Sequence, residues 1–125
     1  MMIKAKILIF FVVFGLSISA DEGPFTQLYS NHGFDVKFIY YSEGTGTRDN
    51  GVVILIINQN DFKIAYSFEL VFRTPGKDKS IIVDGILNAG ERRTGSEDNL
   101  YFLPFKDQSS ISEVGIKKVK VAESK

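Results

Sequence analysis

Large apolar side chains alternate with other residues along the clearest segments of this chain, and a two-residue period indicates β-strands. From Ile64 to Arg73, one face of an extended strand carries Ile64, Tyr66, Phe68, Leu70 and Phe72. The segment 34–41 alternates in the same way, with aromatic residues on one face. No segment beyond residue 20 has a helical period, so the sequence predicts an all-β fold.

Turn residues separate these segments from further expected strands, which cover residues 51–59, 80–87, 91–94, 100–105 and 114–121. Short strands at this spacing, without long crossovers, predict a two-sheet antiparallel β-sandwich of about seven strands. In the last strand the apolar phase changes between Ile116 and Val119. An extra residue near Lys117–Lys118 would restore the phase, so we expect a β-bulge there.

The N-terminal residues have the layout of a secretory signal peptide. Lys4 and Lys6 precede the apolar run Ile7–Phe14, and small residues follow as far as Ala20. The run is too short to span a bilayer, and no later run reaches about 18 apolar residues. We therefore expect cleavage of residues 1–20, one domain over residues 21–125, and a secreted or periplasmic protein without a stable membrane anchor.

Charge and cysteine content exclude several classes of function. Without residues 1–20, the chain retains 13 basic and 15 acidic residues, a net charge of −2. Such a balance provides no electrostatic surface for nucleic acid. The chain has no cysteine, so neither disulfides nor a lipid-modified cysteine are available. Its stability must come from the packing of one apolar core.

One turn resembles a feature of known sandwich domains. The sequence Ile86-Leu87-Asn88-Ala89-Gly90-Glu91 is similar to the leucine-then-glycine turn that precedes a late strand in fibronectin type III modules. Ala89 replaces the proline that is usual in that turn, and arginines follow where a tyrosine is usual. The whole domain resembles immunoglobulin-like and fibronectin type III-like sandwiches in architecture, a resemblance that implies a fold and no particular function.

The sequence contains no convincing catalytic, metal or cofactor motif. His32 is the only histidine and lies in a turn sequence, without a patterned nucleophile or a second metal ligand. The acidic loops at 49–50 and 97–99 are rich in oxygen ligands but lack the spacing of an EF-hand, so calcium binding there stays open. The glycines at 44–47 precede a strand and not a helix, which argues against a phosphate cradle.

The run from Val52 to Ile57 is apolar at every position, although an antiparallel sheet commonly has one wet face. If Val53, Leu55 and Ile57 point into the core, the alternate residues point outward. They would then form an apolar patch with residues of neighbouring strands. The other reading is that loops or the N-terminal segment Phe25–Tyr29 cover the run. The predicted interface residues are Ile39, Tyr41, Val52, Ile54, Ile56 and Val71.

These features favour a non-enzymatic exported binding or assembly module that contacts another protein, either a second copy or an envelope component, through this outer face or its end loops. The alternative is a carbohydrate-binding module that stacks sugars on exposed tyrosines, with Tyr29, Tyr41 and Tyr101 as candidates. A small enzyme is a third and weaker class. Grouped exposed aromatics would favour the sugar hypothesis, and a flat aliphatic patch would favour protein association.

Overall fold

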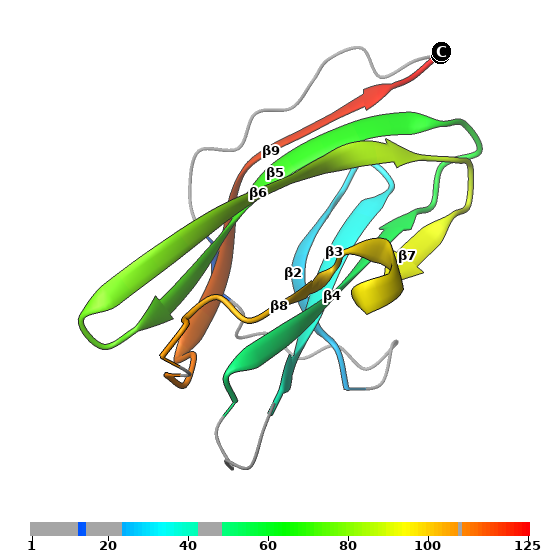
Figure 1. Ribbon diagram of the computed structural model, residues 1–125. Coiled ribbons are helices and arrows are strands. Elements are labelled where there is room, and N and C mark those ends of the chain that lie inside the picture. Colours follow the sequence, from blue (N-terminus) through cyan, green and yellow to red (C-terminus); the bar gives the residue numbers. More distant parts are fainter. Residues whose placement is uncertain (1–12, 15–23, 43–48, 108) are drawn as a thin grey trace.

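The computed structural model describes residues 13–14, 24–42, 49–107 and 109–125, which form two antiparallel sheets that face each other (Figure 1). Sheet A has the order β1-β9-β5-β6, and sheet B has the order β2-β3-β4-β7 with β8 also paired to β4. The strands are β1 (Val13–Phe14), β2 (Thr26–Asn31), β3 (Phe34–Tyr41), β4 (Gly51–Asn58), β5 (Ile64–Thr74), β6 (Lys77–Leu87), β7 (Arg92–Thr94), β8 (Tyr101–Phe102) and β9 (Glu113–Glu123). One short 3-10 helix, η1 (Ser96–Asp98), lies between β7 and β8. The all-β, two-sheet antiparallel prediction is confirmed.

The core lies between the sheets, where the inner side chains of β3, β4, β5 and β9 meet. The alternation predicted for β5 is confirmed, because its even-numbered residues from Ile64 to Phe72 are buried in this core. Aromatic rings fill its centre: the Phe34 ring lies 5.4 Å from that of Tyr66 and 6.2 Å from that of Phe68. In a chain without cysteine, this packing carries the stability that disulfides supply in many small exported domains.

The faces assigned to β4 from sequence are wrong. Val52, Ile54 and Ile56 are fully buried in the core, whereas Val53 and its alternate neighbours face outward. Register explains the difference, because Ile54 pairs with Phe38 and Ile56 with Val36, and directly opposed residues share a face. A run that is apolar at every position contains no polar residue that could reveal its phase.

The N-terminal region is described in part. Val13–Phe14, inside the predicted signal peptide, form β1 and pair with Ile116 and Gly115 of β9. The rest of residues 1–20 lies outside the described residues, so the signal peptide stays a prediction. Thr26–Asn31 form the edge strand β2 of sheet B, although the sequence analysis treated this region only as a covering segment.

The predicted bulge in β9 is present. Glu69 of β5 pairs with Lys117 and Ser67 pairs with Lys120, so two residues of β9 oppose Phe68 alone. One of these two residues, Lys118, has a φ of 56°, in the left-handed region that glycine adopts without strain. The bulge lets Ile116 and Val119 both enter the core.

This backbone geometry predicts how substitutions of Lys118 behave. Lys118→Gly should change the free energy of unfolding by less than about 0.5 kcal/mol, because lost strain offsets added chain entropy. Lys118→Val should lower it by about 1 to 2 kcal/mol, because a β-branched residue fits this conformation poorly. Urea unfolding measures both, with Lys120→Val as the control at an exposed position of the same strand. Equal losses for the two valine variants would contradict the strain argument.

Candidate functional site

The six predicted interface residues do not form one surface. Three of them lie in the core, and Val71 is buried on the outer side of sheet A, where it pairs with Ser80 and Gly115. Ile39 and Tyr41 alone share the outer face of sheet B. The residues that the structure removes from the predicted patch are Val52, Ile54, Ile56 and Val71.

The accessible part of that outer face is rich in tyrosine. The rings of Tyr41, at the end of β3, and Tyr101, in β8, meet edge to face with centroids 5.5 Å apart and an interplanar angle of 88°. Tyr41 is 48% exposed. A hollow of about 310 Å³ beside the pair is lined by Tyr41, Tyr101, Val53 and Ser96. The two tyrosines thus form one wall of a concave surface.

Strand pairing and a glycine position these side chains. Val53 of β4 pairs with Ile39 on one side and with Tyr101 on the other, so the three residues occupy one face. A Cβ at Gly51 would lie 3.2 Å from atoms of both Tyr101 and Leu103, so these side chains pack directly against bare backbone. Leu103 is 45% exposed. We call Tyr41, Val53, Ser96, Tyr101 and Leu103 the tyrosine surface.

At the other end of the same outer face, residues of the central strands β3 and β4 are buried, while Arg92 and Thr94 of β7 are exposed. Leu55 and Ile57 face outward but are buried, as are the cross-strand neighbours Lys37 and Asp35. The Asp35 carboxylate accepts hydrogen bonds from Ser30 Oγ (2.6 Å) and from Gln59 Nε2, so its burial is compensated. Of the large apolar residues that are exposed, Tyr41 and Leu103 both belong to the tyrosine surface.

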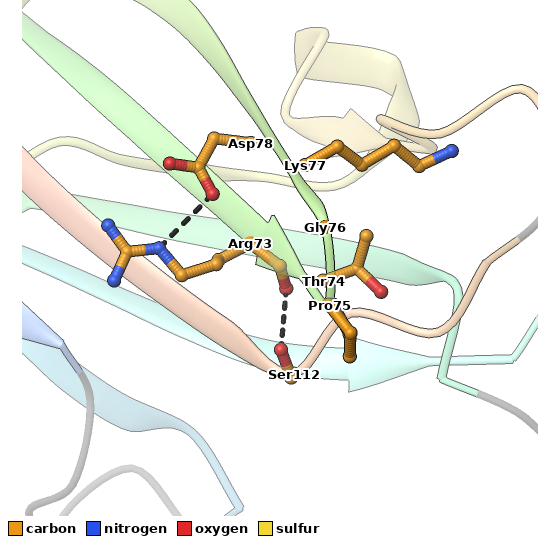
Figure 2. Close-up of a pocket in the computed structure, with 7 residues that line it drawn as sticks. All are labelled: Arg73, Thr74, Pro75, Gly76, Lys77, Asp78 and Ser112. Atoms are coloured by element: carbon orange, nitrogen blue, oxygen red, sulfur yellow. Dashed lines mark hydrogen bonds and ion pairs between the residues drawn. The ribbon is translucent and has the colours of Figure 1, made fainter.

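A second hollow, of about 470 Å³, lies at the tip of the β5–β6 hairpin (Figure 2). Its charges are paired with each other: Arg73 Nε lies 3.2 Å from Asp78 Oδ1, and Ser112 Oγ donates to the Arg73 carbonyl (2.9 Å). Figure 2 shows Lys77 extending away from this pair. Lys77 Nζ lies 2.6 Å from Asp107 Oδ2, and this hydrogen bond holds the pKa of Asp107 below its usual range. These ion pairs are exposed to solvent, so each contributes little to stability.

A third hollow, of about 310 Å³, separates β6 from the β7–β8 segment. Burial raises the pKa of Tyr66 there; the Arg93 charge opposes this shift, and Asp84, Glu91 and Asp98 reinforce it. Arg93 Nε donates to Glu91 Oε2 (2.9 Å), which lowers the pKa of Glu91. Tyr66 therefore keeps its hydroxyl proton at neutral pH.

The tyrosines named for sugar stacking differ in position. Tyr29 lies in the core, where burial raises the pKa of its hydroxyl, and among the described residues this hydroxyl has no hydrogen-bond partner. A buried ring cannot stack on a sugar. Tyr41 and Tyr101 remain as candidates, and the structure brings them into contact.

The remaining sequence candidates lie between the strands. His32 lies in an exposed turn with a φ of 53°, and its carbonyl accepts a hydrogen bond from Asn60 Nδ2 (3.0 Å). Asp98 Oδ2 accepts from the Thr94 amide (2.9 Å). Within the described ranges, no three His, Cys, Asp or Glu side chains gather as a metal site. The glycine loop at 44–47 lies outside those ranges.

Two surface residues were missed by sequence reasoning. Leu103 fell inside the strand expected over residues 100–105, of which only Tyr101–Phe102 is a strand. Ser96 fell in a loop considered only for its acidic residues. Leu103 packs against Gly51, and a backbone bridge joins Gly95, the neighbour of Ser96, to Leu100. No local sequence pattern indicates either contact.

Comparison with known proteins assigns no family to this chain. No protein-family model matches it, and no curated protein matches it. Among solved structures, the crystal structure of Drosophila melanogaster CENP-C bound to CAL1 matches with 15% identity over 83% of this chain and 80% of that chain. The TM-score of 0.17 is too low to support a shared fold. In the part of the chain that the structure describes, no helix is long and apolar enough to cross a bilayer.

Proposed function

We propose that this chain is an exported, non-enzymatic binding module that contacts another protein through the tyrosine surface. The observation that carries the proposal is the edge-to-face pair of Tyr41 and Tyr101 beside a hollow of about 310 Å³. The rings come from different strands and are held by strand pairing and by Gly51. A ligand would therefore meet a surface that is already formed.

Side-chain chemistry favours a protein ligand. Tyrosine is enriched at protein interfaces because it contributes a large rigid area and a polar tip at a low entropic cost. Exposed Leu103 and half-buried Val53 add aliphatic area next to the rings. Aromatic anchors next to a pocket are typical of the residues that dominate binding energy.

Export rests on the sequence of residues 1–20. The basic start, the short apolar run and the small residues before Asp21 support a cleaved signal, which would place the module outside the cytoplasm. Mass spectrometry of exported protein should find a chain that begins near Asp21. An exported chain that retains Met1 would contradict the proposal.

Substitution of Tyr41 tests the protein-binding function. A photo-crosslinking phenylalanine analogue at position 41 should capture a defined partner, and purified wild-type protein should bind that partner at least about 10-fold more tightly than Tyr41→Ala. Lys63→Ala, at an exposed position outside the surface, is the matched control. Biolayer interferometry measures the affinities, and urea unfolding checks that Tyr41→Ala remains folded. Equal affinities for Tyr41→Ala and wild type would contradict the proposal.

Carbohydrate binding is a second candidate, because two tyrosines and the residue Ser96 line one hollow. Sugar recognition uses aromatic ring faces together with hydroxyl groups, and both are present there. A glycan array separates the two functions. A soluble oligosaccharide that binds wild type but neither Tyr41→Ala nor Tyr101→Ala would favour the carbohydrate hypothesis over protein binding.

A further inference from the structure

Sheet A ends in a long open strand. Among the described residues, β6 pairs only with β5, and that pairing runs without a register shift from Thr74↔Lys77 to Ile64↔Leu87. Its 11 residues include two exposed aliphatics, Ile82 (69%) and Ile86 (47%). A long edge with exposed β-branched residues is a template for another strand.

The other sheet edges are protected. On the opposite side of sheet A, β9 carries the bulge and several lysines, which stay in place when cleavage removes β1 with residues 1–20. In sheet B, β2 has six residues and a register shift between Gln27 and Tyr29, while β7 and β8 have only three and two residues. Bulges, lysines and short strands are the usual means of preventing edge pairing. After Lys79, β6 has no bulge and no lysine, and Asp84 is its one charged residue.

The direction of the free backbone groups on β6 follows from hydrogen bonds on β5. The Arg73 carbonyl accepts from the Ser112 amide (2.7 Å), and the Lys63 carbonyl accepts from the Ser124 amide (2.8 Å), so odd-numbered residues of β5 bond toward β9. Even-numbered residues of β5 consequently bond to odd-numbered residues of β6, as register dictates. The outward N–H and C=O groups belong to Asp78, Ser80, Ile82, Asp84 and Ile86.

We propose that β6 pairs antiparallel with β6 of a second copy, about a two-fold axis between the two Ile82 residues. In this register Ile82 opposes Ile82 of the second copy. Ser80 opposes Asp84, and the Ser80 hydroxyl can donate a hydrogen bond to the Asp84 carboxylate. Each opposed pair exchanges two backbone hydrogen bonds. The occupant is a second copy because the strand complements itself, and sheet A would continue across the dimer.

Neighbouring registers fit less well. A shift by one two-residue step places Asp78 opposite Asp84, and like charges in direct opposition are destabilising. The opposite shift places Asp84 against Ile82 at the centre of the interface, whereas the proposed register puts a carboxylate beside an aliphatic side chain only at its ends, where Asp78 opposes Ile86. A hollow also remains between β6 and the β7–β8 segment, so that segment is not packed tightly against the edge. The proposed dimer uses sheet A, whereas the tyrosine surface lies on sheet B.

Cysteine substitution tests the register, because the chain has no cysteine of its own. Ile82→Cys should form a covalent dimer on mild oxidation, since opposed residues lie within the disulfide limit of about 7 Å. Ile86→Cys is the matched control: the two copies of residue 86 would lie about 26 Å apart along the strands. A mixture of Ser80→Cys and Asp84→Cys chains should give the mixed dimer. Equal cross-linking by Ile82→Cys and Ile86→Cys would overturn the proposal.

Sedimentation equilibrium tests the association without cross-linking. Wild type should dimerise, and Ile82→Lys should weaken dimerisation at least about 10-fold by opposing two like charges. Tyr41→Lys, an exposed substitution on sheet B, should leave it unchanged. A monomeric wild type at high micromolar concentration would overturn the proposal. So would a dimer that dissociates with Tyr41→Lys but not with Ile82→Lys.

Discussion

Replacing Ile54 with lysine should strongly destabilise this protein. Ile54 is fully buried between the sheets and pairs with Phe38, so an ammonium group at position 54 would lie in the apolar core. An unpaired buried charge costs several kcal/mol, and we expect a loss of at least about 4 kcal/mol in the free energy of unfolding. Small domains have about 5 to 15 kcal/mol in total, so Ile54→Lys would lose a large share of its stability and unfold at a much lower urea concentration.

Val53→Lys is the matched control on the same strand. Val53 faces outward beside the hollow of the tyrosine surface and is only half-buried, so a lysine stem can extend to solvent. We expect a loss of at most about 1 kcal/mol. Circular dichroism and urea unfolding of both variants measure the difference. If Val53→Lys unfolds the protein and Ile54→Lys does not, the faces of β4 are the reverse of those described.

The contrast between β5 and β4 shows what sequence can determine about this fold. In β5, the polar residues Ser67, Glu69 and Arg73 mark the outer face, so local alternation was enough to predict it. In β4, every residue from Val52 to Ile57 is apolar, and only pairing with β3 sets the phase. Register arises from contacts distant in sequence, which a local pattern does not contain.

The same limit applies to the tyrosine surface. Tyr41 and Tyr101 were both recognised as candidates from sequence, but their contact depends on β8 pairing with β4 next to β3. β8 is only two residues long, and propensity does not distinguish so short a strand from a loop. Residue type therefore identified the aromatics, and topology alone places them together.

Asn58, the last residue of β4, forms a polar junction. Its side chain is fully buried, and Nδ2 donates to the carbonyls of Phe62 and Asn88, each at 2.9 Å. Its Oδ1 accepts from the Asn60 amide (3.0 Å), and its backbone N–H donates to the Glu91 carbonyl (2.9 Å). One side chain thus fastens the end of β4 to the β4–β5 loop and to the turn after β6.

Loss of this junction should be among the most damaging single changes in the chain. Asn58→Ala removes a fully buried amide and its hydrogen bonds to the carbonyls of Phe62 and Asn88, and of these two carbonyls only that of Asn88 keeps a second donor among the described residues, the Glu91 amide (3.0 Å). We therefore expect the free energy of unfolding to fall by about 2 to 4 kcal/mol. Asn88→Ala, which truncates an exposed side chain in the same junction, should cost at most about 0.5 kcal/mol. Similar losses for the two variants would show that the buried Asn58 amide contributes no more to stability than the exposed Asn88 side chain.

Asn58→Asp tests the effect of the hydrogen bonds separately from the effect of side-chain volume. It preserves the shape of the side chain but places a carboxylate against the carbonyls of Phe62 and Asn88. Burial and these carbonyls favour the protonated acid, so the pKa of the new carboxyl should be higher in the folded than in the unfolded chain. The folded state then binds the proton more tightly, and the stability of Asn58→Asp relative to wild type should rise as the pH falls from about 7 toward 4. Asn58→Ala carries no titratable group, so its deficit should stay constant over this range. Urea unfolding at several pH values gives both curves, and parallel curves would contradict the proposed burial of the side chain.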